Sequence, residues 1–370
     1  MILGINYPWY NYDWDFGTPP PGWQTRAAWA ETLENDLKVF RRCNIQVVRW
    51  FILGSGMLYG SGMQAPHRLG AQWRFDQIPR IDDAILEDFE RLLQIFRKHD
   101  LQILPVLIDF KWAFPGLDRH SNDDLALKSW FGSEASFESL KNNLTAFPAG
   151  LVKGGRIDVL YDAKKRNQFF AQVLEPFLEI SRPFSDTIYA WELINEPEWI
   201  TRGTNGGLPE HMKVPFHRML AFLRTGMTFI QGYGFPSTVG FARAGTIADW
   251  NERAYRYIQS LTKRTLSPEG NYLNLDINQV HYYPQPSDVL APAAFPNDRP
   301  AVLGEFATRI HPEHWPELPA DHQHITSRLR FAQTKGYAAA FPWSYRATDQ
   351  HTEAHKSVVE AGISTFQVAG

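Results

Sequence analysis

The chain has 370 residues, of which 44% are hydrophobic, and its 37 basic and 40 acidic side chains leave a formal net charge of -3. That length allows one large barrel or two ordinary domains, and balanced charge without long runs of one sign argues against a nucleic-acid partner. A neutral ligand fits better, and no window of the sequence is apolar for long enough to cross a bilayer.

Short β-branched or aliphatic runs alternate with amphipathic stretches, which is the pattern of a parallel sheet covered by helices. We predict strands, in chain order, at Ile2 to Asn6, Ile45 to Ile52, Leu101 to Ile108, Thr187 to Ile194, Ser237 to Phe241, Asp276 to His281, Pro300 to Glu305 and Ala338 to Trp343. Eight strands close a (β/α)8 TIM barrel. We therefore expect an α/β fold with one domain over residues 1–370.

The stretch from Ile81 to Phe96 carries an apolar stripe at helical spacing, and its first turn is acidic, as suits a helix N-terminus. Long connections follow the second strand, Leu53 to Arg80, and the third, Asp109 to about Asp162. We predict that they wall the cleft, because barrel loops after strands build the active face. The alternative is that they only cover the outside of the barrel.

Other general features bear on location and cofactors. Cys43 is the only cysteine, so no intramolecular disulfide can form, and we expect it to be buried. The run from Met1 to Asn6 resembles a strand rather than a signal peptide. We expect a cytoplasmic protein, or a secreted one if a signal peptide has been removed. We expect no cofactor, since no glycine-rich phosphate loop follows the first strand, and the oligomeric state is left open.

The predicted strands end in unusually polar residues, which would meet at one mouth of the barrel. They are Arg49, Asp109, Asn195, Glu196, His281, Tyr283 and Glu305. Glu196 and Glu305 follow the fourth and seventh strands, across the mouth from one another. A separation of about 5 to 5.5 Å suits a retaining glycoside hydrolase, in which one carboxylate is the nucleophile. The alternatives to a catalytic site are structural roles: helix capping by the glutamates, a structural ion pair for Arg49, and core packing for His281 and Tyr283.

The motifs Asn195-Glu196-Pro197, His281-Tyr282-Tyr283, Gly304-Glu305-Phe306 and Trp343-Ser344 fall in order on successive strands. In this the chain resembles the clan A (β/α)8 retaining glycoside hydrolases, most closely glycoside hydrolase family 5, the cellulase and mannanase family. The resemblance implies that Glu196 is the acid/base and Glu305 the nucleophile. It implies that Asn195 binds the sugar 2-hydroxyl, that His281 orients Glu196, and that Trp343, with a cis peptide after it, forms the floor under the sugar.

Arg49 and the Tyr283 hydroxyl are then expected to hold down the pKa of Glu305. The chain departs from the family at the third strand, where Asp109 stands in place of the usual His. Either Asp109 or Lys111 takes that sugar contact, or the protein belongs to a neighbouring family of the clan.

Aromatic residues supply 14% of the chain, including 13 Trp, and a few of these are candidate sugar platforms. Trp9, Trp112 and Trp199 are such candidates, with core packing as the alternative for each. Two histidine groupings, one around His351 and His355 and one from His311 to His324, lack a zincin signature. We read those histidines as surface residues and expect no metal site.

The function predicted from these features is retaining hydrolysis of β-glycosidic bonds in neutral hexose oligo- or polysaccharides, with a β-mannoside or β-glucoside favoured. A transglycosylase of the same clan and a catalytically silent carbohydrate-binding barrel are the alternatives. The predicted partner is a carbohydrate substrate, with no nucleic acid and no membrane. The sequence leaves endo or exo action open.

Overall fold

The computed structural model describes residues 1–8, 10, 15–17, 26–54, 56, 67–69, 72–74, 78, 80–113, 157–204, 210, 213–283, 295, 298–309, 321–346 and 355–368. Within them the predicted eight-stranded barrel is confirmed. Its strands are β1 (Ile2–Asn6), β2 (Val47–Phe51), β5 (Gln102–Asp109), β6 (Trp191–Asn195), β7 (Ser237–Phe241), β8 (Ile277–Tyr282), β9 (Ala301–Ala307) and β10 (Ala339–Trp343). All pair in parallel with their neighbours, and β1 closes the barrel between β2 and β10.

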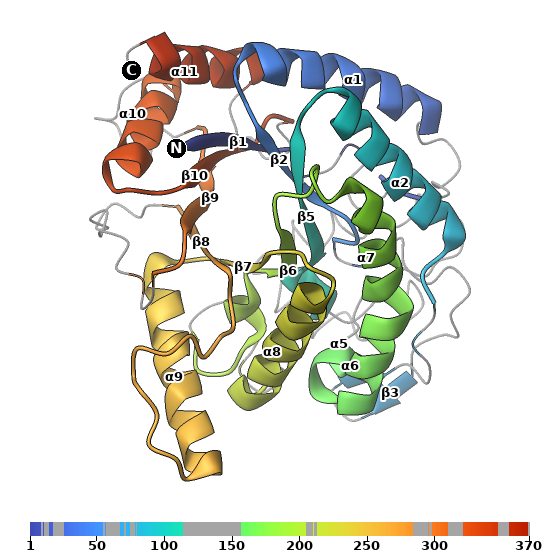
Figure 1. Cartoon of the computed structure of the whole chain (residues 1–370), viewed down its shortest axis with the longest axis vertical. Helices are drawn as coiled ribbons and strands as arrows, with labels where there is room; N and C mark the ends of the chain where they lie inside the picture. The colour runs from blue at the N-terminus through green and yellow to red at the C-terminus, as the bar shows by residue number, and fades with distance from the viewer. Residues whose placement is uncertain are drawn as a thin grey trace.

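Helices surround the barrel (Figure 1). They are α1 (Arg26–Arg42), α2 (Asp83–Lys98), α5 (Ile157–Tyr161), α6 (Ala163–Phe169), α7 (Glu175–Ser181), α8 (Phe216–Gly232), α9 (Ala244–Thr262), α10 (Asp321–Thr334) and α11 (Lys356–Val368). A π-helical turn, Phe170–Leu174, joins α6 to α7, and short 3-10 turns follow β5 at Phe110–Ala113, α7 at Arg182–Phe184 and β6 at Pro197–Ile200. No helix of the described residues is long and apolar enough to span a membrane.

Two layers of apolar side chains hold the fold. A small cluster fills the barrel interior, with Val47 and Phe51 from β2 and Phe341 from β10 among its fully or nearly fully buried members. A larger cluster packs between the strands and the helices and includes Cys43, which is buried as predicted. Side chains of a strand alternate between these layers. Arg49 lies between Val47 and Phe51 on β2 and therefore faces the interior.

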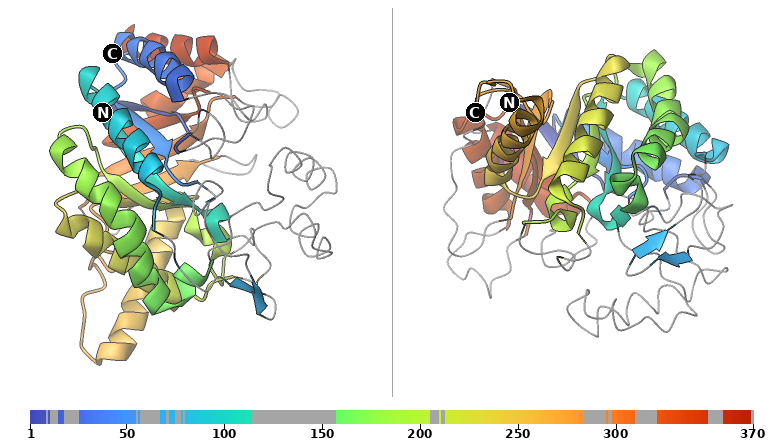
Figure 2. Two further views of the ribbon diagram at one scale, coloured as in Figure 1. Left: turned by 90° about the vertical axis from the view of Figure 1, so that its right-hand side faces the viewer. Right: turned by 90° about the horizontal axis from the view of Figure 1, so that it is seen from below.

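Three predicted strands are shorter than expected, and one feature was missed. The run from Ile45 to Ile52 forms only Val47–Phe51, and the run from Ala338 to Trp343 begins at Ala339. Of the run from Thr187 to Ile194, only Trp191 onward joins the ladder, while Ile188 makes an isolated bridge to Ile103. A hairpin of β3 (His67–Leu69) and β4 (Gln72–Arg74) lies outside the barrel (Figure 2). Most of the two long connections falls outside the described residues, so their place beside the cleft stays a prediction.

Two irregularities in the ladder reorient side chains at the mouth. Between Leu303 and Phe306, β9 contains one more residue than the segment of β10 that pairs with it, Ala340 to Pro342. The register of β9 against β8 shifts at the same place. β6 likewise has one more residue than β7 between Glu192 and Asn195. Because side chains alternate along a strand, one extra residue reverses the face on which the following side chains lie. The last residues of both strands are reoriented in this way.

Candidate active site

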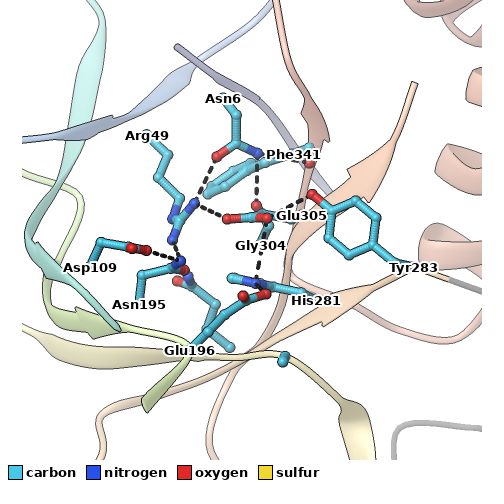
Figure 3. A network of polar contacts seen from close by, with 12 residues as sticks. Asn6, Arg49, Asp109, Asn195, Glu196, His281, Tyr283, Gly304, Glu305 and Phe341 are labelled. Carbon is cyan, nitrogen blue, oxygen red and sulfur yellow. Dashed lines mark hydrogen bonds and ion pairs between the residues drawn. The ribbon is translucent and has the colours of Figure 1, made fainter. Parts of the chain in front are cut away.

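The polar ends of six strands meet in one network inside the mouth of the barrel (Figure 3). It contains all seven polar residues predicted for the mouth: Arg49, Asp109, Asn195, Glu196, His281, Tyr283 and Glu305. Asn6, Glu192 and Gln279 join them and were not predicted. Asn6 and Glu192 are polar residues in mostly apolar strands, and that is the signal that could have revealed them, whereas Gln279 lies in a strand with other polar residues.

Glu196 lies immediately after β6 with its backbone in the left-handed region, at φ 47° and ψ 50°. For a residue with a side chain this conformation costs about 1 kcal/mol and is typical of functional positions. It is held by a hydrogen bond from the Glu196 N–H to the Gly240 carbonyl, 2.6 Å long, and by Pro197, which begins the 3-10 turn. The strained turn carries the carboxyl group into the mouth of the barrel.

The two carboxylate oxygens of Glu196 have different partners. Oε2 accepts a hydrogen bond from the Trp199 indole N–H at 2.8 Å, and Oε1 lies 2.8 Å from His281 Nδ1. Burial raises the pKa of Glu196 to about 7, although the Trp199 N–H and the more distant Arg49 charge lower it. Glu196 can therefore hold a proton near neutral pH.

Glu305 sits on β9 directly after the extra residue and points to the interior. Figure 3 shows its carboxylate between Arg49, whose Nη1 is 2.5 Å from Oε1, and Tyr283, whose hydroxyl donates to Oε2 at 2.7 Å. Gly304 precedes it, and a Cβ there would lie 2.7 Å from the Gln279 side chain. Only glycine fits the interior face at that point without displacing Gln279.

The expected partners of Glu305 are in place, but the expected direction of its pKa is wrong. Arg49 and Tyr283 do lower the pKa of Glu305, and so does His281, yet burial raises it by more, and the pKa ends above its ordinary value. The cause is that the carboxylate is almost completely removed from water beside a second carboxyl group. Glu305 still has the direct contact with the Arg49 cation, which Glu196 lacks.

The two glutamates are close together. One oxygen of each, with a ring nitrogen of His281, forms a group in which all atoms lie within 4.8 Å of one another. This carboxylate spacing is near the roughly 5 to 5.5 Å of retaining glycosidases and well short of the roughly 6.5 to 9.5 Å of inverting ones. The same three side chains are the one metal-like cluster within the described part of the chain, but the Arg49 charge on Glu305 would repel a cation there.

Arg49 is the centre of the network and is fully buried. Its Nε and Nη2 bind both oxygens of Glu192, at 2.7 and 2.6 Å, and its Nη1 also donates to Asn6. A second bond from Nη2 reaches Asn195 Oδ1 at 2.8 Å. The charges of Glu192 and Glu305 keep Arg49 protonated and raise its pKa despite its burial. Arg49 is thus both the structural ion-pair residue of the alternative interpretation and a direct contact of Glu305.

His281 is a neutral residue between the two glutamates. Burial lowers its pKa to about 4, although the Glu305 charge acts in the opposite sense. Its Nδ1 is 2.8 Å from Glu196 and 3.6 Å from Glu305, and its Nε2 has no hydrogen-bond partner among the described residues. Gly240 leaves room for this ring, because a Cβ at Gly240 would lie 2.8 Å from Nε2.

Asp109 and Asn195 form a pair at the ends of β5 and β6. The Asn195 amide donates to Asp109 Oδ2 at 2.8 Å, while Asp109 Oδ1 accepts from the Lys111 backbone N–H at 2.9 Å. Since Asn195 Oδ1 is bound by Arg49, the amide is fixed at both ends. Asp109 is buried behind it, so in this structure it orients Asn195. Its pKa is raised by burial.

The aromatic candidates divide into different environments. Trp343 is half-buried at the end of β10, its ring lies edge-on to Phe51, and the peptide bond to Ser344 is cis, as predicted. Trp199 is half-buried beside Glu196. Trp112 is fully buried against Phe169, so the packing alternative applies to it and the platform prediction does not. Trp9 lies outside the described residues.

The histidines read as surface residues need one correction. His324 on α10 is buried, with Nε2 3.0 Å from the Ala307 carbonyl, because α10 packs its inner face on β9. His355 is exposed at the start of α11. The positions 311, 314 and 351 and the side chain at 322 lie outside what the structure describes.

Comparison with known proteins supports the fold. No family model matches the chain, and no curated protein matches it. Among solved structures it is similar to the endo-1,4-β-mannanase from Eisenia fetida, with 17% identity and a TM-score of 0.64 over 98% of this chain and 90% of that one. The β-1,4-mannanase from the sea hare Aplysia kurodai gives 17% identity and 0.64 over 98% and 91%. The β-mannanase from the mussel Mytilus edulis gives 17% and 0.62 over 98% and 91%. At such identities the likeness establishes the barrel.

Proposed function

We propose that this protein is a retaining glycoside hydrolase that cleaves β-glycosidic bonds, with Glu305 as nucleophile and Glu196 as acid/base. The observation that carries the proposal is the pair of carboxyl groups at the ends of β6 and β9, half-buried Glu196 and buried Glu305, with oxygens within 4.8 Å. That spacing leaves no room for a water molecule between one carboxylate and the sugar, as inversion requires.

The chemistry proceeds in two displacements. Glu305 attacks the anomeric carbon while Glu196 gives its proton to the departing oxygen, which leaves a glycosyl ester on Glu305. Glu196, now a carboxylate, then takes a proton from water as the water attacks the anomeric carbon, and Glu305 is released with the β configuration restored. Each glutamate returns to its starting protonation state.

The surroundings of the glutamates suit these roles. Glu196 has a pKa of about 7 and a neutral neighbour in His281, so it begins protonated. Once Glu305 becomes an ester its negative charge is gone, and the pKa of Glu196 falls, which makes Glu196 a base when a base is needed. Arg49 and Tyr283 stabilise the Glu305 carboxylate as a leaving group in the second step.

The substrate proposed is a neutral hexose oligo- or polysaccharide linked by β-mannosidic or β-glucosidic bonds. Arg49 and Asp109 hold the Asn195 amide, which in this proposal binds the 2-hydroxyl, and Trp343 supplies an apolar face at the same mouth. The similar barrels of the three β-mannanases favour a mannoside over a glucoside, and membership of glycoside hydrolase family 5 is part of this proposal. Transglycosylation by the same glycosyl ester differs only in the acceptor that replaces water.

The test is a panel of aryl β-glycosides of mannose, glucose, galactose and xylose and of their β-1,4-linked disaccharides. We expect phenol release from a mannoside or glucoside, with the β-anomer as the first product in proton NMR spectra taken before mutarotation. Release with the α-anomer first would contradict retention. Binding without release from any substrate would favour the carbohydrate-binding barrel, and glycosylated acceptors at high substrate would favour transglycosylation.

Activity is expected to fall as the pH rises through about 7, the pKa of Glu196. Above its pKa, Glu196 has lost the proton that the leaving oxygen needs, so kcat/KM for an aryl glycoside of a poor leaving group drops about tenfold per pH unit. The check is a kcat/KM profile from pH 4 to 9. A dinitrophenyl glycoside is the control, because its leaving group needs no proton and should lack this basic limb. A level profile to pH 9 for the poor leaving group would be incompatible with Glu196 as the acid.

A further inference from the structure

The side of Glu196 that faces away from Glu305 has its own binding features. His281 contacts both glutamates and binds Oε1 of Glu196, whereas Trp199 binds Oε2. In the proposed reaction Glu196 protonates the departing oxygen, so the group attached to that oxygen lies on the Glu196 side. Trp199 is therefore placed to contact the leaving group rather than the sugar that becomes attached to Glu305.

The guanidinium group of Arg243 stacks over the Trp199 ring. The Arg243 guanidinium carbon lies 5.7 Å from the centre of the Trp199 ring, within the range of cation–π stacking. Arg243 is exposed, and its guanidinium makes no ion pair with any residue that the structure describes. The stacking orients the guanidinium, and its N–H groups donate to no other residue in the described part of the chain.

The segments that carry Trp199 and Arg243 are fixed to one another. Buried Glu198, one residue before Trp199, accepts a hydrogen bond from the Ala242 N–H at 2.6 Å, one residue before Arg243. The Glu196 N–H binds Gly240 on the same strand end. The positions of Trp199 and Arg243 are thus set by the ends of β6 and β7 and not by a free loop.

Neighbouring charges leave this side positive. Burial raises the pKa of Glu198 to about 8, so at neutral pH it is mostly protonated and does not neutralise Arg243. Lys111 follows Phe110 in the 3-10 turn after β5, the Phe110 ring centre lies 6.5 Å from that of Trp199, and the Lys111 charge lowers the pKa of Glu196. A leaving group with a negative charge would meet favourable potential there.

We infer that Trp199 and Arg243 form a leaving-group subsite, and that Arg243 favours substrates whose leaving group carries a carboxylate. The inference rests on the proposed function and adds a substrate class to it, namely a neutral glycosyl unit joined to a carboxylate-bearing sugar or aromatic alcohol. A planar guanidinium matches a carboxylate through two parallel hydrogen bonds, which a sugar hydroxyl cannot accept.

The test compares two aryl glycosides of the same mono- and disaccharides, one with a 3-carboxyphenyl and one with a 3-carbamoylphenyl leaving group. At pH 6 and low salt, the ratio of their kcat/KM values in the wild-type protein should exceed the ratio in Arg243→Gln by about five- to tenfold. Dividing one ratio by the other removes the intrinsic reactivity of the two phenols. Salt at 0.5 M should shrink the difference, because it screens exposed charges.

Two variants control the comparison. Arg243→Lys keeps the charge and should keep part of the preference, and Arg330→Gln, which removes an exposed cation from α10, should leave the wild-type ratio unchanged. A second substrate pair, a β-1,4-glycosyl glucuronic acid and its glycosyl glucose counterpart, separates the sugar source of the carboxylate from the aromatic one. A shift in either pair on Arg243→Gln supports the subsite.

The failures are distinguishable. Equal ratios in the wild-type protein and Arg243→Gln for both pairs, with all substrates cleaved, would overturn the subsite and leave the proposed function standing. If the wild-type protein cleaved none of these glycosides, the proposed function itself would fail and the inference with it.

Discussion

Replacement of Glu305 by Gln is expected to lower kcat for β-glycosides by at least about 10,000-fold, because the amide cannot form the glycosyl ester. The amide has nearly the shape of the carboxylate and can still accept from Tyr283, so the fold should be retained. The measurement is kcat on the best substrate of the panel, with circular dichroism to verify folding. Glu31→Gln, an exposed carboxylate on α1, is the matched control and should keep full activity.

The roles of the two glutamates can be separated by azide, which fits the space left by a removed carboxylate. In Glu305→Ala, azide attacks from the nucleophile side and yields an α-glycosyl azide. In Glu196→Ala, a dinitrophenyl glycoside still forms the ester on Glu305, and azide then opens it to a β-glycosyl azide. The opposite pattern of anomers would exchange the two assignments, and full activity of Glu305→Gln would remove the proposed mechanism.

Arg49→Met is expected to have the largest effect on stability, about 3 to 5 kcal/mol. Arg49 is fully buried and is the hydrogen-bonded cation for both Glu192 and Glu305, so its loss leaves two buried carboxyl groups without that charge. The measurement is the free energy of unfolding in urea at pH 7. Activity should fall as well, because the pKa of Glu305 rises when its cation is removed.

Two comparisons isolate the cause. Arg41→Met breaks the exposed pair between Arg41 and Asp100, whose side chains are 47% and 87% accessible, and should cost less than about 1 kcal/mol. Adding Glu192→Met to Arg49→Met removes one of the buried carboxyl groups that Arg49→Met leaves without a cation. The double variant should therefore recover part of the lost free energy of unfolding. If Arg49→Met cost no more than Arg41→Met, the buried network would not be what stabilises the mouth of the barrel.

The sequence predicted the strands well because buried parallel strands are continuous apolar runs. Ser237–Phe241 is predicted to the residue, and Ile2–Asn6 likewise. The hairpin His67–Leu69 and Gln72–Arg74 was missed because its strands are three residues each and lack apolar alternation. Trp112 was ambiguous because a Trp just after a strand can either pack in the core or bind a sugar, and only its neighbours in space decide which.

The sequence by itself determined the eight-stranded order and the identity of the polar residues at strand ends, because both depend on the local pattern of apolar and polar residues. Tertiary structure alone decided which way those residues face and how strongly they hold protons. An extra residue in β9 turns Glu305 to the interior, and burial beside Glu196 raises the pKa that Arg49 was expected to lower. The face of the sheet on which a side chain lies depends on the register between strands, and the desolvation of a carboxyl group depends on all the atoms packed around it. Neither can be read from a residue and its neighbours in the chain.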